Sequence, residues 1–124
     1  MIESPRITAL YSLLVLFQFL HILEEIGLEA YRELGSLKRY LKVAGVLVTV
    51  NFVPLLMMLL EIPGSLVLGL VGASMGIGNG VVHVVGYLKT RSIRGTVGAG
   101  VFTSIPLGMI GVIVLCQLIA TLLR

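Results

Sequence analysis

The sequence predicts an all-α integral membrane protein that folds as an antiparallel four-helix bundle. Hydrophobic residues make up 57% of the 124 residues, and the mean hydropathy is +1.08. This is more apolar surface than a soluble domain of this length can bury, so lipid is expected to be the solvent for most of the chain. Charged residues contribute only 12% and gather in short stretches, which are expected to be the parts that meet water.

Four apolar segments account for most of the chain, at about residues 7–28, 40–60, 65–88 and 96–123. Each has roughly the 20 residues that a helix needs to cross a hydrocarbon core about 30 Å thick. The connections between them are short. Consecutive helices are therefore expected to run antiparallel, within a single domain that spans residues 1–124.

The basic residues predict the orientation of the bundle. One side of the membrane receives Arg32, Lys38, Arg39, Lys42, Lys89, Arg91 and Arg94, and the other receives Arg6 and Arg124. The positive-inside rule then places the loops at 29–39 and 89–95 in the cytoplasm and both termini outside, in the cell inner (plasma) membrane. The net charge of +3 is therefore interpreted as a topology signal, with the lipid bilayer and no nucleic acid as partner.

Small residues predict where helices pack closely. The third segment carries a ridge at four-residue spacing, made of Gly72, Gly76 and Gly80. The fourth segment carries a stripe made of Gly100, Ser104, Gly108 and Gly111. Because small side chains let helix backbones approach each other, the third and fourth helices are expected to be neighbours. The same faces offer a contact for a homo-oligomer.

Ionisable side chains occur inside the apolar segments, where each one requires a partner or a functional reason. In the first segment His21 is followed by Glu24 and Glu25, so that both carboxylates flank one imidazole on the same helix face. In the third segment Asn79 and His83 are four residues apart and also share a face. Counting about 1.5 Å per residue from the flanking charges puts the two histidines at similar depth. The five side chains are therefore expected to share one polar cavity that opens toward the cytoplasm.

The residues of this cavity suit a metal ion. Imidazole and carboxylate ligands bind Zn²⁺, Fe²⁺ or Mn²⁺, and helix bundles hold such ions in their cores. We predict one divalent ion, with His21, Glu24 and His83 as ligands and with Glu25 and Asn79 in supporting roles. The candidate catalytic residues are His21, Glu24, Glu25 and His83.

The alternative is a metal-free proton relay, since buried carboxyl and imidazole groups serve as general acids and bases near neutral pH. Either site is expected to act on a lipophilic substrate.

Other classes of function fit the same pattern. The cluster can belong to a transport or binding module for ions, protons or small molecules, or the chain can be a structural membrane subunit. The remaining polar residues of the later segments, Asn51, Thr103 and Ser104, are interpreted as helix-packing groups. Nucleophilic catalysis is not supported, because the single cysteine, Cys116, lies in the last segment toward the side opposite the histidines.

One short motif resembles a known family. The pentapeptide from His21 to Glu25 reads His-x-x-Glu-Glu, and Asn79 and His83 form an Asn-x-x-x-His pair in a later helix. With the four-helix layout, these residues resemble the HXXEE family of small bacterial integral membrane proteins. The loop before the last segment departs from the family pattern, because Arg94 stands where the family tends to have proline. The family's function is uncharacterised, so the resemblance implies positions of interest and no particular reaction.

Overall fold

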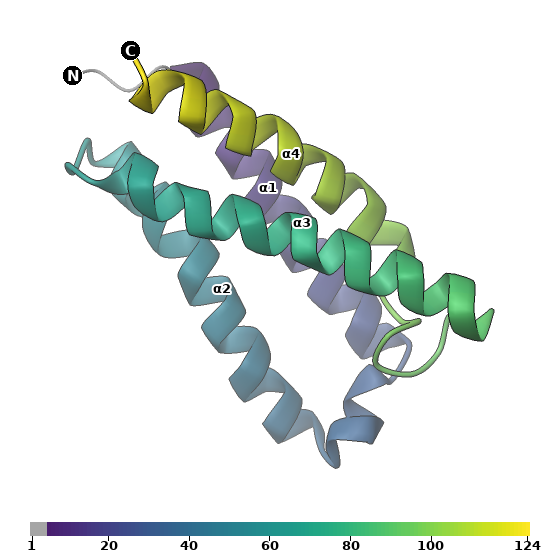
Figure 1. Ribbon diagram of the computed structural model, residues 1–124. Coiled ribbons are helices and arrows are strands. Elements are labelled where there is room, and N and C mark those ends of the chain that lie inside the picture. Colours follow the sequence, from purple (N-terminus) through teal and green to yellow (C-terminus); the bar gives the residue numbers. More distant parts are fainter. Residues whose placement is uncertain (1–4) are drawn as a thin grey trace.

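Four long helices make up nearly all of the structure, which is a computed structural model that describes residues 5–124. In chain order they are α1 (Pro5–Gly27), α2 (Leu37–Leu59), α3 (Ser65–Thr90) and α4 (Val101–Leu122), with a short 3-10 helix, η1 (Ala30–Leu34), after α1 (Figure 1). Each of the four long helices is long and apolar enough to cross a membrane. The predicted all-α class and the four-helix bundle are confirmed, and the chain is a multi-pass membrane protein.

The helices pack as a ring in which α3 and α4 form the most extensive contact. Helix α4 also packs on α1, α1 on α2, and α2 on α3, while the backbones of α2 and α4 stay apart within residues 5–124. In Figure 1, α3 and α4 lie in front of α1, and α2 diverges from α3 toward the end where α2 begins. The prediction that the third and fourth helices are neighbours is thus confirmed.

Glycines explain the closeness of α3 and α4. A Cβ atom added at Gly80 would lie 3.0 Å from the Cα atom of Gly108 and 3.1 Å from the carbonyl oxygen of Ser104. A Cβ atom added at Gly111 would lie 2.9 Å from the carbonyl oxygen of Ala73. The two backbones therefore touch directly, which is the contact that small residues permit in a membrane.

The core of the bundle follows the inward face of α1. Ile7, Tyr11 and Leu14 are at most 2% exposed and pack with residues of the other three helices. Outward residues are large and apolar, such as Leu16 at 51% exposure and Met109 at 63%. This inside-out pattern is expected where lipid covers the outer surface.

The segment before α4 differs from the prediction. The last apolar segment was expected to be helical from about residue 96, but α4 begins at Val101 and residues 91–100 form a loop. Gly95 and Gly100 have φ angles of 83° and 89°, a left-handed backbone that ends or precedes helices and favours glycine. Gly100 is therefore the N-cap of α4 and not part of its packing stripe. The loop is fastened to η1, because the backbone N–H of Thr96 donates to Oε2 of Glu33 at 2.8 Å.

Candidate metal centre

The two histidines of the chain face each other inside the bundle. His21 of α1 is 2% exposed and His83 of α3 is 5% exposed, and their ring centroids lie 4.6 Å apart at an interplanar angle of 74°. His21 precedes the end of α1 by six residues and His83 precedes the end of α3 by seven, so both lie about 9–10 Å from a helix end. The predicted meeting of the two imidazoles at one depth is confirmed.

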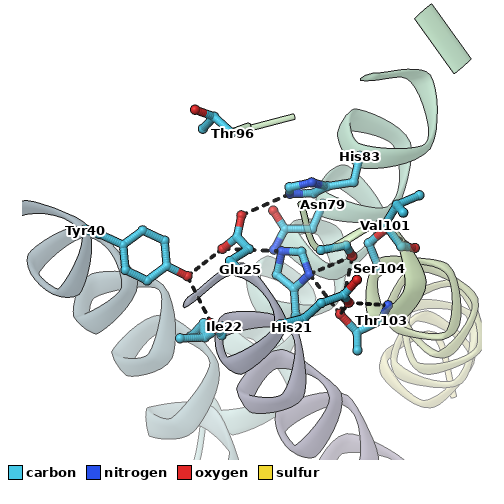
Figure 2. A network of polar contacts seen from close by, with 12 residues as sticks. His21, Ile22, Glu25, Tyr40, Asn79, His83, Thr96, Val101, Thr103 and Ser104 are labelled. Carbon is cyan, nitrogen blue, oxygen red and sulfur yellow. Dashed lines mark hydrogen bonds and ion pairs between the residues drawn. The ribbon is translucent and has the colours of Figure 1, made fainter. Parts of the chain in front are cut away.

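The carboxylate of Glu25 lies beside the pair of rings and faces both of them, as Figure 2 shows. Its Oε2 atom is 3.8 Å from Nε2 of His21, and its Oε1 atom is 3.5 Å from Nε2 of His83. One ligand atom from each of the three residues lies within 4.8 Å of the other two. Tetrahedral zinc with bonds of about 2.0–2.1 Å holds neighbouring ligand atoms about 3.4 Å apart. The separations at Glu25 are therefore close to those of ligands around one ion.

Nδ1 of His21 is held by α4. It donates to the carbonyl oxygen of Gly100 at 3.2 Å and lies 3.2 Å from Oγ1 of Thr103. A carbonyl only accepts, so Nδ1 carries the proton and the lone pair of the ring is on Nε2, which faces Glu25. Metal-binding histidines are commonly oriented in this way, with one ring nitrogen bound to a carbonyl and the other to the ion.

The imidazole of His83 has fewer hydrogen bonds than that of His21. Nε2 of His83 faces Glu25, while Nδ1 has no hydrogen bond of good geometry within residues 5–124. The backbone of Val97 and Ala99 lies beside this ring. The loop before α4 thus forms a wall next to His83, as it does next to His21.

Tyr40 is a member of this site that the sequence interpretation missed. Its hydroxyl donates to Oε2 of Glu25 at 2.6 Å and lies 3.4 Å from the carbonyl oxygen of Ile22 (Figure 2). Tyr40 is 6% exposed and stands in the first turns of α2. The only signal in the sequence is its position, since the start of the second helix and the end of the first must lie at the same depth.

Glu24 has a different setting from Glu25. Its carboxylate accepts from the backbone N–H of Phe102 at 3.2 Å and of Thr103 at 2.8 Å, and also from the Thr103 hydroxyl. The first backbone N–H groups of a helix lack partners within it, and the N-cap Gly100 has no side chain to supply one. Glu24 therefore caps α4 from α1, with its negative charge at the positive end of the helix dipole. Thr103, interpreted from the sequence as a packing residue, links Glu24 to His21.

Asn79 lies one turn deeper than His83. Its side-chain amide donates to Oε1 of Gln18 at 3.3 Å, which joins α3 to α1 beneath the imidazoles. The structure therefore brings Asn79 near the cluster as part of its floor. Cys116 is free and exposed, far along α4 from this end of the bundle.

Within the described part of the chain, no lysine or arginine pairs with the carboxylate of Glu25, whose side chain is only 13% exposed. Within residues 5–124 the ion-pair partners of Glu25 are the two histidines, and the one pair between a basic side chain and a carboxylate, Arg32 with Glu29, lies exposed on the surface. A buried carboxylate without a positive partner is strongly disfavoured. Charge balance at this position therefore requires a protonated imidazole, a bound cation or a protonated Glu25 carboxyl group.

Comparisons of the chain with protein-family models, with curated proteins and with solved structures found no match. The resemblance to the HXXEE family therefore rests on the motif residues themselves. What the structure establishes is that the chain has four candidate membrane spans and a buried cluster of His21, Glu25 and His83.

Proposed function

We propose that this protein is a membrane metalloenzyme that binds one divalent ion through His21, Glu25 and His83 and acts on a lipophilic substrate. The observation that carries the proposal is the convergence of the three donor atoms within 4.8 Å inside the bundle. Relative to the sequence prediction, Glu25 takes the ligand position and Glu24 a supporting one, since the Glu24 carboxylate is engaged by the start of α4.

The chemistry of the donor set supports a single ion. Two imidazoles and one carboxylate are the ligands of catalytic zinc sites and of non-haem ferrous sites, and they also bind Mn²⁺. Three protein ligands leave a coordination position open, which is the arrangement of catalytic and not of structural sites. Such an ion acts as a Lewis acid toward a substrate oxygen.

The contacts of Glu25 favour a metal site over a triad in which His21, Glu25 and His83 are joined only by hydrogen bonds. The contacts from Glu25 to the two Nε2 atoms, at 3.8 and 3.5 Å, are longer than ordinary N–H···O hydrogen bonds of about 2.7–3.2 Å. By contrast, Tyr40 makes a short hydrogen bond to the same carboxylate. Glu25 is thus oriented by Tyr40 at Oε2, and its other oxygen, Oε1, faces Nε2 of His83, as expected for a metal ligand with an outer partner.

The depth of the cluster suggests the substrate. The two histidines lie about 9–10 Å from the helix ends and Glu25 about 3 Å from the end of α1, and the polar interface of a bilayer is about 5–7 Å thick on each side. The site then falls near the boundary between headgroups and acyl chains, on the side that the basic loops assign to the cytoplasm. A lipid-like molecule with a polar group at this depth would meet the ion without leaving the membrane.

Metal content tests the proposal. The protein is purified in mild detergent without a polyhistidine tag, because the chain itself has only two histidines, and bound metal is measured by mass spectrometry. We expect about one Zn²⁺, Fe²⁺ or Mn²⁺ per chain, and less than about one tenth of that in His21→Ala and in His83→Ala. Cys116→Ser is the matched control and should retain the metal, because Cys116 is exposed and far from the cluster.

A second experiment, in which metal is added back to the protein, covers the case in which the bound metal is lost during purification. Protein stripped with a chelator is titrated with each of the three ions under anaerobic conditions, and binding is followed by calorimetry. Saturable binding in the wild type that is absent in His83→Ala supports the proposal. Equal binding in the wild type and in both histidine variants would remove the metal site.

A further inference from the structure

Buried polar side chains continue from the metal centre into the depth of the bundle. Gln18 and Asn51 are 1% exposed and Tyr11 is 0% exposed. Each carries a polar atom without a hydrogen-bond partner within residues 5–124, namely Nε2 of Gln18, Oδ1 of Asn51 and the hydroxyl of Tyr11. In a bilayer such atoms are costly to leave without a partner, so they are normally satisfied by protein groups or by internal water.

These atoms form a column with the metal centre. Tyr11, Gln18, His21 and Glu25 are separated by seven, three and four residues, the spacing that keeps side chains on one helix face. From Tyr11 to Glu25 this face extends over about 21 Å. The hydrogen bond from Asn79 to Gln18 adds α3 to the column directly beneath the two imidazoles.

The deep end of the column lies where three helices meet. The Tyr11 hydroxyl occupies the space that a side chain at position 72 would fill, and Oδ1 of Asn51 lies 3.1 Å from the same point. The Asn51 amide donates to the backbone of its own helix, at the carbonyl oxygen of Leu47. The absence of a side chain at Gly72 therefore lets the Tyr11 hydroxyl of α1 and the Asn51 amide oxygen of α2 approach the same point. The hydroxyl, a donor, and the amide oxygen, an acceptor, both remain without a hydrogen-bond partner among the described residues.

An apolar layer divides the column between Tyr11 and Gln18. Leu14, 0% exposed, lies on α1 between Tyr11 and Gln18. Its Cδ1 atom is 2.9 Å from where a Cβ at Gly76 would be, and Cδ1 of Leu107, also 0% exposed, lies 3.6 Å from that point. Polar groups therefore stand on both sides of a leucine layer, about two helical turns apart along α1.

We propose that this column is a proton path along the bundle axis, carried by internal water, and that the Leu14 layer closes it between Tyr11 and Gln18. Each water or hydroxyl in such a chain accepts one proton as it releases another, so no other reactant is required. The path connects the imidazole level with the half of the bundle that holds Tyr11 and Asn51. It is a function beyond the proposed metal chemistry, and it does not depend on bound metal.

The close contact of the Tyr11 hydroxyl with Gly72 makes the path narrow. A hydrated alkali cation needs more room than this packing leaves, whereas a proton needs only continuous hydrogen bonds. The path is therefore expected to discriminate strongly between H⁺ and K⁺.

Proton flux in liposomes tests the proposal. The full chain is reconstituted with a pH-sensitive dye inside, and a K⁺ gradient with valinomycin drives protons inward. Every protein in the assay also carries Met58→Ser, because buried apolar side chains, among them Met58 and Leu118, close the column beyond Tyr11. Met58→Ser alone should conduct little, since Leu14 still closes the column. Leu14→Ser, which puts a hydroxyl in the layer, should raise the proton flux about tenfold or more. The double variants Leu14→Ser/Gln18→Leu and Leu14→Ser/Tyr11→Phe should return it to the level of Met58→Ser alone.

Val15→Ser is the matched control. Val15 is the next residue of the same helix and is 5% exposed, so this variant buries the same hydroxyl on a different face. If Leu14→Ser conducts no faster than Val15→Ser, or if the double variants stay fast, the proton path is refuted. Flux of K⁺ without valinomycin in Leu14→Ser would also refute it, since it would indicate a general leak.

A second variant covers the case in which Leu14→Ser does not fold. Leu107→Ser places a hydroxyl in the same layer from α4 and should open the same path. Size-exclusion chromatography and helical content establish that each variant is folded before flux is measured. Metal content is expected to be unchanged in Leu14→Ser, which separates the failure of this proposal from the failure of the metal site.

Discussion

The backbone of Gly100 lies directly against the imidazole ring of His21. Its carbonyl oxygen accepts from Nδ1 at 3.2 Å, and a Cβ atom added at Gly100 would clash with Nδ1 and Cε1 of that ring. The φ angle of Gly100 is 89°, which glycine adopts freely and other residues rarely adopt. The start of α4 therefore fixes both the position and the tautomer of the histidine.

Gly100→Ala is expected to weaken metal binding about 10- to 100-fold, the usual effect of disturbing a group that orients a ligand. Calorimetric titration of the stripped protein measures it. The matched control is Gly64→Ala, because Gly64 has a φ angle of 88° and no atom within 4 Å of an added Cβ. Both variants carry the same backbone strain, so equal metal affinities in the two would show that the contact with His21 is without consequence.

The two neighbouring glutamates should respond differently to neutralisation. Glu25→Gln removes the carboxylate that faces both imidazoles and should abolish metal binding. Glu24→Gln removes the charge that caps α4 and should leave metal content largely unchanged while lowering stability by about 1–2 kcal/mol. Metal analysis and denaturation of the same preparations distinguish the two effects. The assignment of ligand roles is reversed if Glu24→Gln is the variant that loses the metal.

Tyr40 is expected to act as a positioning residue for Glu25. Tyr40→Phe deletes the 2.6 Å hydrogen bond to the carboxylate and keeps the ring that packs between α1 and α2. We expect metal affinity to fall about tenfold, with bound metal still reaching one ion per chain at saturation.

Tyr31→Phe is the control for Tyr40→Phe, because Tyr31 packs on the same small cluster without a hydrogen bond to Glu25. A purely structural role would lower stability and leave the affinity unaltered.

The helices could be predicted because their signal is local. Length and hydropathy define each span, and the glycines at positions 80 and 108 indicated which helices touch. Residues 96–100 were predicted less well, since their hydropathy continues into α4 while glycines with positive φ angles keep the backbone out of a helix. Which of these two effects prevails depends on the contact of the loop with Glu33, which lies far away in the sequence.

The site was predicted in outline and not in detail for the same reason. Helical spacing and depth brought His21 and His83 together correctly. Spacing alone does not distinguish Glu24 from Glu25, since both flank His21 and the choice depends on where α4 begins. Tyr40 and Thr103 carry no motif, and their roles follow only from the three-dimensional packing of α2 and α4 against α1.

The contact of α3 with α4 predicts the effect of size at two nearby glycines. Gly80 touches the backbone of α4, whereas Gly78 has no atom within 4 Å of an added Cβ and faces outward. Gly80→Leu should destabilise the protein by about 1–3 kcal/mol or more, because the helices must separate to admit the side chain. Gly78→Leu should be nearly neutral. Reversible unfolding in mixed micelles measures both, and equal stabilities would contradict the packing.

The loop before α4 should loosen in acid through one carboxyl group. Hydrogen bonds from the hydroxyl and the backbone N–H of Thr96 lower the pKa of the Glu33 side chain from its ordinary value of 4.5. A group whose pKa is lower in the folded state stabilises that state fully above its unfolded pKa, and this stabilisation is lost as the pH falls through the folded pKa. The protection of the Thr96 amide against hydrogen exchange, corrected for intrinsic exchange, should therefore be constant from about pH 7 to pH 5 and fall below about pH 4.

Glu33→Gln should show low protection of this amide at every pH. Glu29→Gln, which alters an exposed pair with Arg32, should behave like the wild type. Protection that persists in acid, or a fall that survives in Glu33→Gln, would show that another group fastens the loop.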